Sequence, residues 1–261
     1  MDRPTDRSES GGEGGGASLE QGGGEALESP AGAMGAVERD PQIARRHAMV
    51  EFQLRGGGIR DHDLLAVFER IPRERFVPAW LVDRAYDDSA LGIGSGQTIS
   101  QPYMVAVMTD ALELTAWHRG HPGSRAHVLD VGTGSGYQAA VLAELGSDVV
   151  SIERDSALSE AARRRLDALG YGDRIRCVVG DGSNGWPGLA PYDAIVVGAA
   201  APDVPEPLVV QLGDGGRLVV PVGRRDRQEL RVVRRIGARI EERTLDPCVF
   251  VPLVGEHGFR A

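Results

Sequence analysis

The sequence predicts an α/β protein built on a doubly wound, mostly parallel sheet, with helices before it and antiparallel strands after it. From residue 126 onward, short apolar runs alternate with stretches of helical periodicity, as in strands joined by crossover helices. One such unit, residues 128–145, passes from an apolar strand through three alternate glycines into a helix. After residue 226 only strand-like runs are left, so antiparallel strands are expected to complete the sheet.

Composition divides the chain into an N-terminal tail and a single folded domain. Residues 1–40 are rich in Gly, Glu and Ser and carry nine acidic residues and three arginines. Such a segment buries too little apolar surface to offset its ordering entropy, so a disordered tail is predicted. Residues 41–261 are expected to form a single domain. Its parts are N-terminal helices and a loop segment (41–125), a ligand-binding core (126–225) and C-terminal strands (226–261).

Helix signals open the domain. Apolar periodicity at 43–54 stops at three consecutive glycines, and a second helix follows through 64–68. Asp61 or Asp63 is expected to cap this second helix and Pro72 to end it.

A loop-rich segment is then expected up to about residue 101. Pro102 stands where a first-turn proline would, and it opens a helix predicted to continue through Leu114.

The remaining elements follow from the change between the two periodicities. Strands are expected near 126–131, 148–153, 175–180, 193–198 and 217–222, and after the core at 228–236, 238–244 and 248–254. Helices are expected at 135–145, 156–169 and about 205–212.

The glycine turn indicates a ligand at the edge of the sheet. Glycine has no Cβ and tolerates positive φ, which suits a backbone that passes close to a small molecule. A dinucleotide fingerprint would place its third glycine where Tyr137 stands, whereas here that glycine comes one residue earlier, at Gly136. The pattern after Asp130 instead resembles motif I of class I S-adenosylmethionine-dependent methyltransferases. A nicotinamide or flavin enzyme, and a turn with no ligand, stay open as alternatives.

Acidic residues fall at the expected ends of three successive strands: Asp130, Glu153 and Asp181. A carboxylate at Glu153, 21 residues after Gly132, has the spacing of the ribose-binding acid of nucleotide folds. Asp181 is placed to accept the adenine amino group. The predicted cofactor-binding residues are therefore Asp130, Gly132, Thr133, Gly134, Gly136, Glu153, Asp181 and Gly182.

A longer set of motifs resembles the protein-L-isoaspartate O-methyltransferases. The matching segments, which lie in order between about 42 and 255, are 93–106, 128–143, 191–197, 211–223 and 250–254. The string Gln97-Thr-Ile-Ser-Gln-Pro102 is the most specific of them. The resemblance implies a Rossmann-like methyltransferase fold and transfer of a methyl group from S-adenosylmethionine to the free α-carboxylate of isoaspartyl residues. The resulting ester then closes to a succinimide, which begins repair.

The same resemblance assigns the acceptor side. It implies that Ser100 is the active-site serine and that Gln97, Thr98 and Ile99 bind substrate. A carboxylate with a pKa near 4 is ionised at neutral pH, so methyl transfer needs orientation rather than a general base. Ser100 has a structural alternative as the N-terminal cap of the helix that opens at Pro102.

Three residues depart from the family pattern. Asp130 stands where Glu is common, Ser95 replaces a usually aromatic or longer polar residue, and Gly198 stands where Thr is usual. The departures at Ser95 and Gly198 are expected to alter recognition of the acceptor.

Charge and composition limit the partners. The net charge of −9 comes mostly from the tail, so no broad nucleic-acid surface is expected. The Asn/Asp-Pro-Pro motif of amino-methylating nucleic-acid enzymes does not occur at 198–205. No metal site, membrane span or secretory signal is expected, and we predict a cytoplasmic monomer whose partners are isoaspartyl peptides and proteins.

Two further interpretations stay open. One is a methyltransferase that forms aspartimides on a single precursor peptide, since its catalytic domain would look nearly the same. The other is a non-catalytic module that senses cofactor or damaged protein.

Overall fold

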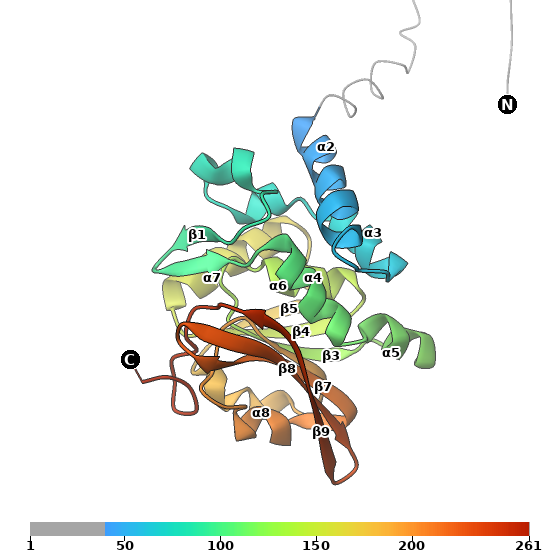
Figure 1. Cartoon of the computed structure of the whole chain (residues 1–261), viewed down its shortest axis with the longest axis vertical. Coiled ribbons are helices and arrows are strands. Elements are labelled where there is room, and N and C mark those ends of the chain that lie inside the picture. The colour runs from blue at the N-terminus through green and yellow to red at the C-terminus, as the bar shows by residue number, and fades with distance from the viewer. Residues whose placement is uncertain (1–39, 261) are drawn as a thin grey trace, which may run out of the picture. The chain divides into compact units, whose positions relative to one another are not determined.

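The computed structural model describes residues 40–260, coloured in Figure 1. The predicted tail, residues 1–40, lies outside the described residues except for Asp40, whose carboxylate caps the first helix. Disorder of the tail therefore stays a prediction. The division of the domain into three parts also stays a prediction.

A seven-stranded sheet forms the centre of the described part of the chain, in the order β5-β4-β3-β6-β7-β8-β9. The strands are β3 (His127–Val131), β4 (Asp148–Glu153), β5 (Ile175–Val179), β6 (Tyr192–Val197), β7 (Leu212–Arg224), β8 (Arg227–Ile236) and β9 (Arg239–Cys248). The first five are parallel, and β8 and β9 are antiparallel to their neighbours. The predicted fold class is confirmed.

Side chains on β3 alternate between two buried clusters. Val128 packs with the apolar side of α6 (Tyr137–Glu144), whereas Leu129 packs on the opposite face with Leu208 of α8 (Glu206–Val210). Both faces of a parallel sheet are thus covered, as crossover connections require. Figure 1 shows α6 and α8 on opposite sides of the sheet, and α7 (Ser156–Ala168) supplies the crossover between β4 and β5.

The N-terminal helices pack on the same side as α6. Helix α2 (Pro41–Ala48) continues directly into a π-helical segment, η1 (Met49–Arg55), and α3 (His62–Arg70) follows. Asp61, not Asp63, caps α3, because its carboxylate accepts the N–H groups of Asp63 and Leu64 at 2.9 and 3.1 Å.

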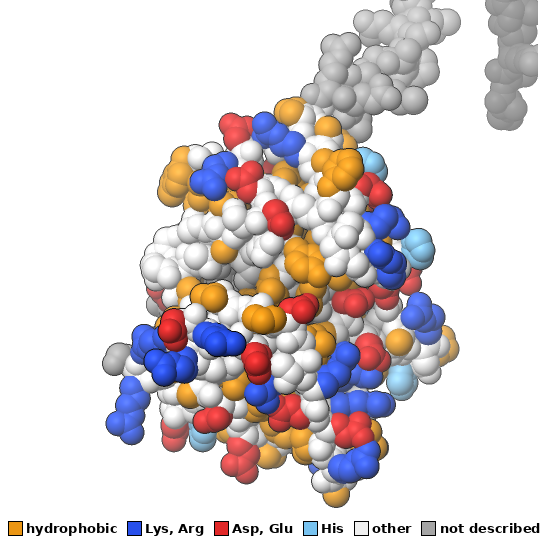
Figure 2. Space-filling view, in the orientation of Figure 1, with side chains coloured by type: hydrophobic (Ala, Val, Ile, Leu, Met, Phe, Trp, Pro, Cys, Tyr) orange, Lys and Arg blue, Asp and Glu red, His pale blue; other side chains and the backbone are white. Residues whose placement is uncertain are grey.

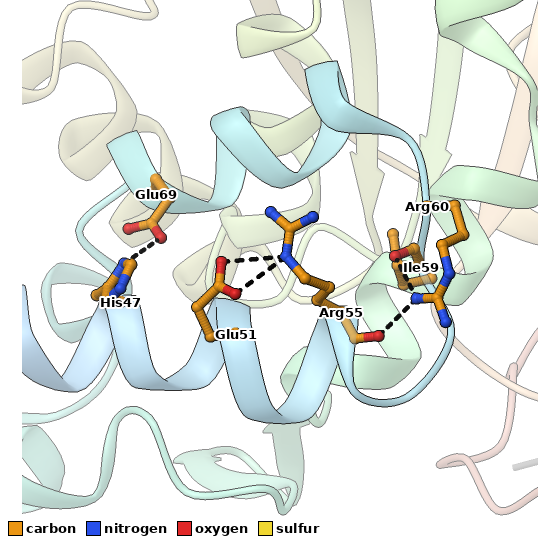
Figure 3. A network of polar contacts seen from close by, with 6 residues as sticks. All are labelled: His47, Glu51, Arg55, Ile59, Arg60 and Glu69. Carbon is orange, nitrogen blue, oxygen red and sulfur yellow. Dashed lines mark hydrogen bonds and ion pairs between the residues drawn. The ribbon is translucent and has the colours of Figure 1, made fainter.

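Polar contacts run along the exposed side of these helices, as Figure 3 shows. His47 on α2 contacts Glu69 on α3 at 2.8 Å, and Arg55 pairs with Glu51 one helical turn earlier. Exposed pairs of this kind contribute little to stability. The buried side chains Met49 and Leu54, both at most 1% exposed, hold the helices on the core.

The segment predicted as loop contains short ordered elements. Two 3₁₀ helices, η2 (Arg73–Phe76) and η3 (Ala79–Arg84), precede a hairpin of β1 (Leu91–Gly94) and β2 (Gln97–Ile99). Helix α4 (Pro102–Ala111) opens at the predicted proline. It ends before Leu114, because Glu113 adopts a left-handed conformation with φ of 54° and a separate helix, α5 (Leu114–Gly120), begins there.

The expected strands at 238–244 and 248–254 need correction. A single strand, β9, runs from 239 to 248, and Pro247 is accommodated because β9 is an edge strand. The residues after it form no ladder and make only isolated bridges, among them Ala200 with Pro252. The chain leaves the sheet there and passes over the ends of the parallel strands.

Candidate active site

A cleft lies at the carboxyl ends of the parallel strands, where open α/β sheets bind their ligands. Its floor is formed by the residues that end or follow β3, β4 and β6, with the hairpin on one side and residues 251–254 on the other. The lining residues are Gln97, Thr98, Val131, Gly132, Gly134, Ile152, Glu153, Arg154, Gly182, Gly198, Ala199, Val251, Pro252, Leu253 and Val254.

Glu153, the last residue of β4, is the acidic residue on the floor of this cleft. One carboxylate oxygen accepts the backbone N–H of Gly134 at 3.0 Å, and the other accepts that of Asp155 at 3.1 Å. These bonds fix the carboxylate plane and tie the glycine turn to β4. Each carboxylate oxygen can accept a further hydrogen bond, so the two oxygens together are suited to bind the two hydroxyls of a vicinal diol.

The glycines of the cleft keep side chains out of it. Gly134 has φ of +51°, and a Cβ there would lie 3.5 Å from Ile93 Cδ1 of the hairpin. The glycine turn is therefore shaped for close approach of a ligand to backbone. Gly182 also lines the cleft, but a Cβ there would lie 2.6 Å from Val131 Cγ1, so glycine is needed at this position for packing against β3.

Three predicted cofactor residues lie beneath the cleft instead of lining it. Asp130 is fully buried and accepts a hydrogen bond from the Ser151 hydroxyl at 2.7 Å. The Thr133 and Ser151 hydroxyls are 2.7 Å apart. A Cβ at Gly136 would lie 3.1 Å from Leu166 on α7, so this glycine permits helix packing. These residues support the turn from below.

Burial governs the electrostatics of Asp130. Desolvation raises its pKa to about 7, against the opposing effect of the Ser151 hydrogen bond. Its place in the sheet explains this, because Asp130 pairs with Ser151, two residues before Glu153, and so lies deeper below the carboxyl ends of the strands.

Asp181 follows β5 and does not line the cleft itself, although its neighbour Gly182 does, and its carboxylate is already engaged. Burial acts to raise its pKa, yet hydrogen bonds from the Glu256 N–H and from Ser183 lower it. A side chain at Gly255 would collide with this carboxylate. The C-terminal turn thus packs directly on Asp181, a contact that sequence reasoning missed because these residues lie far apart in the chain.

The acceptor-side residues fall in two places. Gln97 and Thr98 line the cleft, whereas Ile99 is 4% exposed and its side chain belongs to the core. Thr98 also lines a neighbouring pocket of about 470 Å³ that contains Ser100. This pocket is completed by Ala90, Gln101, Met104, Asp226, Arg227, Pro247, Cys248, Val249 and Phe250.

Ser100 lies between β2 and α4 and does not cap the helix. The cap position of α4 is Gln101, and within residues 40–260 no side chain accepts from the first turn of that helix. The Gln101 amide instead donates to Asp88 at 2.7 Å. The structural alternative for Ser100 is wrong, and its hydroxyl is available to the pocket.

These two adjoining spaces fit a nucleoside-containing methyl donor and an acceptor. The donor cleft combines a diol-binding carboxylate with a turn free of side chains, and Thr98 belongs to both spaces. Among the described residues, no three His, Cys, Asp or Glu side chains are grouped so that they would hold a metal ion.

Comparison with known proteins decides between the remaining interpretations. The family model of protein-L-isoaspartate(D-aspartate) O-methyltransferase matches residues 44–258. The chain belongs to this family. A protein-L-isoaspartate O-methyltransferase of Methanoculleus marisnigri is 52% identical over 225 residues, covering 86% of this chain and 98% of that protein. One of Methylorubrum populi is 53% identical over 212 residues, covering 81% and 95%.

Solved structures agree with the sequence comparison. A protein-L-isoaspartate O-methyltransferase structure superposes with a TM-score of 0.71 at 29% identity, covering 82% of this chain and 67% of that one. The methyl donor of this isoaspartate O-methyltransferase is S-adenosylmethionine, and its reaction methylates isoaspartyl residues and so starts their repair. The resemblance stated above is confirmed, and the nicotinamide, flavin and nucleic-acid alternatives are excluded.

On the face of the described residues that Figure 2 shows, arginines and acidic residues are interspersed. Within residues 40–260, no helix has the length and apolar character needed to cross a membrane.

Proposed function

We propose that the two spaces divide the reaction, with the donor in the cleft around Glu153 and the isoaspartyl α-carboxylate in the pocket beside Ser100. The observation that carries this proposal is Thr98, which lines both spaces and so marks where they meet. When bound, S-adenosylmethionine supplies a methyl group on a positively charged sulfur.

On the donor side, the Glu153 carboxylate accepts hydrogen bonds from the ribose hydroxyls, since both its oxygens are oriented by backbone N–H groups. Gly132 and Gly134 let the backbone approach the ligand, Gly182 lines the cleft while packing closely on Val131, and Asp181 lies at the adenine end. Asp130, Thr133 and Gly136 act one layer below, where they hold the turn in place.

On the acceptor side, the Ser100 hydroxyl donates a hydrogen bond to the substrate carboxylate and directs one oxygen toward the donor. Thr98 and Gln97 face the same junction, and Ile99 anchors the strand by burying its side chain. The carboxylate is already ionised at neutral pH, so no base is required. Orientation of this kind supplies up to about 7–11 kcal/mol of the barrier reduction.

The acceptor range proposed is damaged protein in general, rather than one dedicated peptide. The acceptor pocket opens to solvent and is lined mainly by small and apolar side chains, which suits varied flanking residues. Both spaces are complete within one chain, which supports a monomer. Cys177 and Cys248 are both free, which supports a reducing compartment such as the cytoplasm.

A paired-peptide assay tests the proposal. Labelled S-adenosylmethionine is incubated with the protein and with peptides that differ only in isoAsp or Asp at one position, in several sequence contexts. Base-labile label on isoAsp peptides of every context is expected. Label confined to one context would favour the dedicated enzyme, and transfer to neither peptide would contradict the function. Light scattering at the assay concentration checks the monomer.

A further inference from the structure

Arg73, the first residue of η2, is a fully buried arginine outside the motifs that identify the family's donor turn and acceptor loop. Its Nε donates to the carbonyl of Ala85 at 2.7 Å, and its Nη2 donates to the carbonyl of Ser100 at 2.7 Å. One guanidinium therefore joins Ala85, which follows η3, to Ser100, the residue that we place beside the substrate.

The same guanidinium also reaches the donor side. It lies over the ring of Tyr137, 4.8 Å from the centroid. Tyr137 is the first residue of α6, directly after Gly136 of the glycine turn, and is 2% exposed. Phe76 and Phe68 pack edge-on against this ring at 5.3 and 6.2 Å, so the ring cannot shift independently of the N-terminal segment.

Stability alone does not explain an arginine at this place. In the described part of the chain Arg73 has no ion-pair partner, and burial lowers its pKa. A buried charge without a countercharge is costly, and an apolar side chain of similar volume would commonly be tolerated as well or better. What an apolar residue would not provide is the rigid, planar set of donors that spans two carbonyls while stacking on a ring.

We infer that Arg73 is a positioning residue that fixes the backbone of Ser100 relative to the donor-binding turn, through the Ser100 carbonyl on one side and the Tyr137 ring on the other. The inference rests on the proposed role of Ser100. It assigns Arg73 to the alignment of the two substrates and not to the binding of either one.

Arg73→Met and Arg73→Lys test this assignment. Because a displacement of about 1 Å can cost on the order of 10²-fold, we expect Arg73→Met to lower kcat by about 10- to 100-fold. KM for the isoAsp peptide and the dissociation constant for S-adenosylmethionine should change by less than about 3-fold. Lysine keeps the charge but cannot span both carbonyls or stack as a plane, so Arg73→Lys should fall between Arg73→Met and the unsubstituted chain.

Arg174 offers a control with the same two kinds of contact, although it is partly exposed and also pairs with Glu144 at 3.8 Å. Its guanidinium donates to the Ala143 carbonyl at 2.5 Å and lies 5.7 Å from the Tyr171 ring, but at the far end of α6. Arg174→Met should lower the melting temperature without changing kcat per folded molecule by more than about 2-fold. Folded enzyme is counted by its stoichiometry of S-adenosylmethionine binding.

The outcomes separate the two proposals. Turnover of the isoAsp peptide by the unsubstituted chain tests the function, and the ratio of variant to unsubstituted kcat tests the inference. An unchanged kcat per folded molecule in Arg73→Lys or Arg73→Met, or an equal loss in Arg174→Met, would show that Arg73 is only structural. If Arg73→Met does not fold, Arg73→Lys alone decides.

Discussion

The donor and acceptor sides of this active site are built in different ways. The donor side comes from neighbouring parallel strands: Glu153 pairs with Val179 on β5, the Gly132 N–H donates to the carbonyl of Ile152, and the Gly134 N–H donates to the Glu153 carboxylate. The acceptor side gathers the hairpin, the β7–β8 turn and residues 247–250 from distant parts of the chain. A rigid strand ladder suits the donor, which is the same molecule in every turnover. A pocket gathered from distant segments can adjust to acceptors that differ from one another.

The largest effect is expected from Ser100→Ala, which alters only the acceptor side. Loss of the hydroxyl removes the donor that orients the substrate carboxylate, so kcat should fall by about 10²-fold. S-adenosylmethionine should bind as before, because Ser100 does not line the donor cleft. Turnover of an isoAsp peptide and calorimetric titration of the cofactor measure both quantities. Ser124→Ala, in an exposed turn before β3, is the control. Full turnover in Ser100→Ala would remove this residue from the site.

Glu153→Gln alters the donor side and leaves the acceptor side as it is. The amide keeps the shape of the side chain but loses the charge, and it places a donor where an acceptor is needed. Charge-assisted hydrogen bonds contribute about 1.5–3 kcal/mol, so the dissociation constant for S-adenosylmethionine should rise by about 10- to 100-fold. KM for the peptide, at saturating cofactor, should stay near normal. Glu206→Gln, exposed on α8, is the control; an unchanged cofactor affinity in Glu153→Gln would refute the ribose assignment.

The same contrast explains what could be predicted from sequence. The glycine turn and the acid at Glu153 follow rules of spacing within one strand–helix–strand unit, and the structure places both at the cleft. Asp130 is also acidic and lies close to a strand end, yet it is fully buried, whereas Glu153 lines the cleft. The ladder pairs Asp130 with Ser151, so its side chain lies on the same face of the sheet as Glu153 but one step farther from the strand ends. Patterns locate the strand end only to within a few residues.

The acceptor side was harder to predict because its signals are weak or long-range. Gly92 and Gly94 dilute the strand pattern of β1, and the turn needs three successive residues with positive φ, including Ser95 at 51°. Arg73 stands in the string Arg-Glu-Arg, where nothing separates a buried arginine from an exposed one. Its burial follows from packing against Tyr137, a contact between residues 64 positions apart in the sequence.

The buried carboxyl under the donor turn predicts a dependence of stability on pH. The folded-state pKa of Asp130, about 7, lies above its ordinary value of 3.8, so the folded state holds the proton more tightly. This contribution to stability is complete below pH 3.8 and is lost as pH rises through 7. Each unit of pH within that window corresponds to about 1.4 kcal/mol at most.

Denaturation of the unsubstituted chain and of Asp130→Asn, at pH 5 and pH 8, measures this effect. The free energy of unfolding of the unsubstituted chain, relative to the variant, should fall by about 2–3 kcal/mol between the two values. A difference between the two proteins that does not vary with pH would contradict the burial of a titrating Asp130.

The smallest effect is expected from Gly198→Thr, which restores the residue usual in the family at the edge of the donor cleft. A Cβ at Gly198 would lie 3.5 Å from the carbonyl oxygens of Gly132 and Val131, an ordinary contact. The melting temperature should therefore change by less than about 2 °C and the cofactor affinity by less than about 2-fold.

Gly182→Ala is the matched contrast. Its Cβ would lie 2.6 Å from Val131 Cγ1, so the substitution should lower the free energy of unfolding by about 1–3 kcal/mol. With the donor side unchanged, any altered KM among isoAsp peptides in Gly198→Thr reports on the acceptor side alone; weakened cofactor binding would show that the two sides are not separable at this residue.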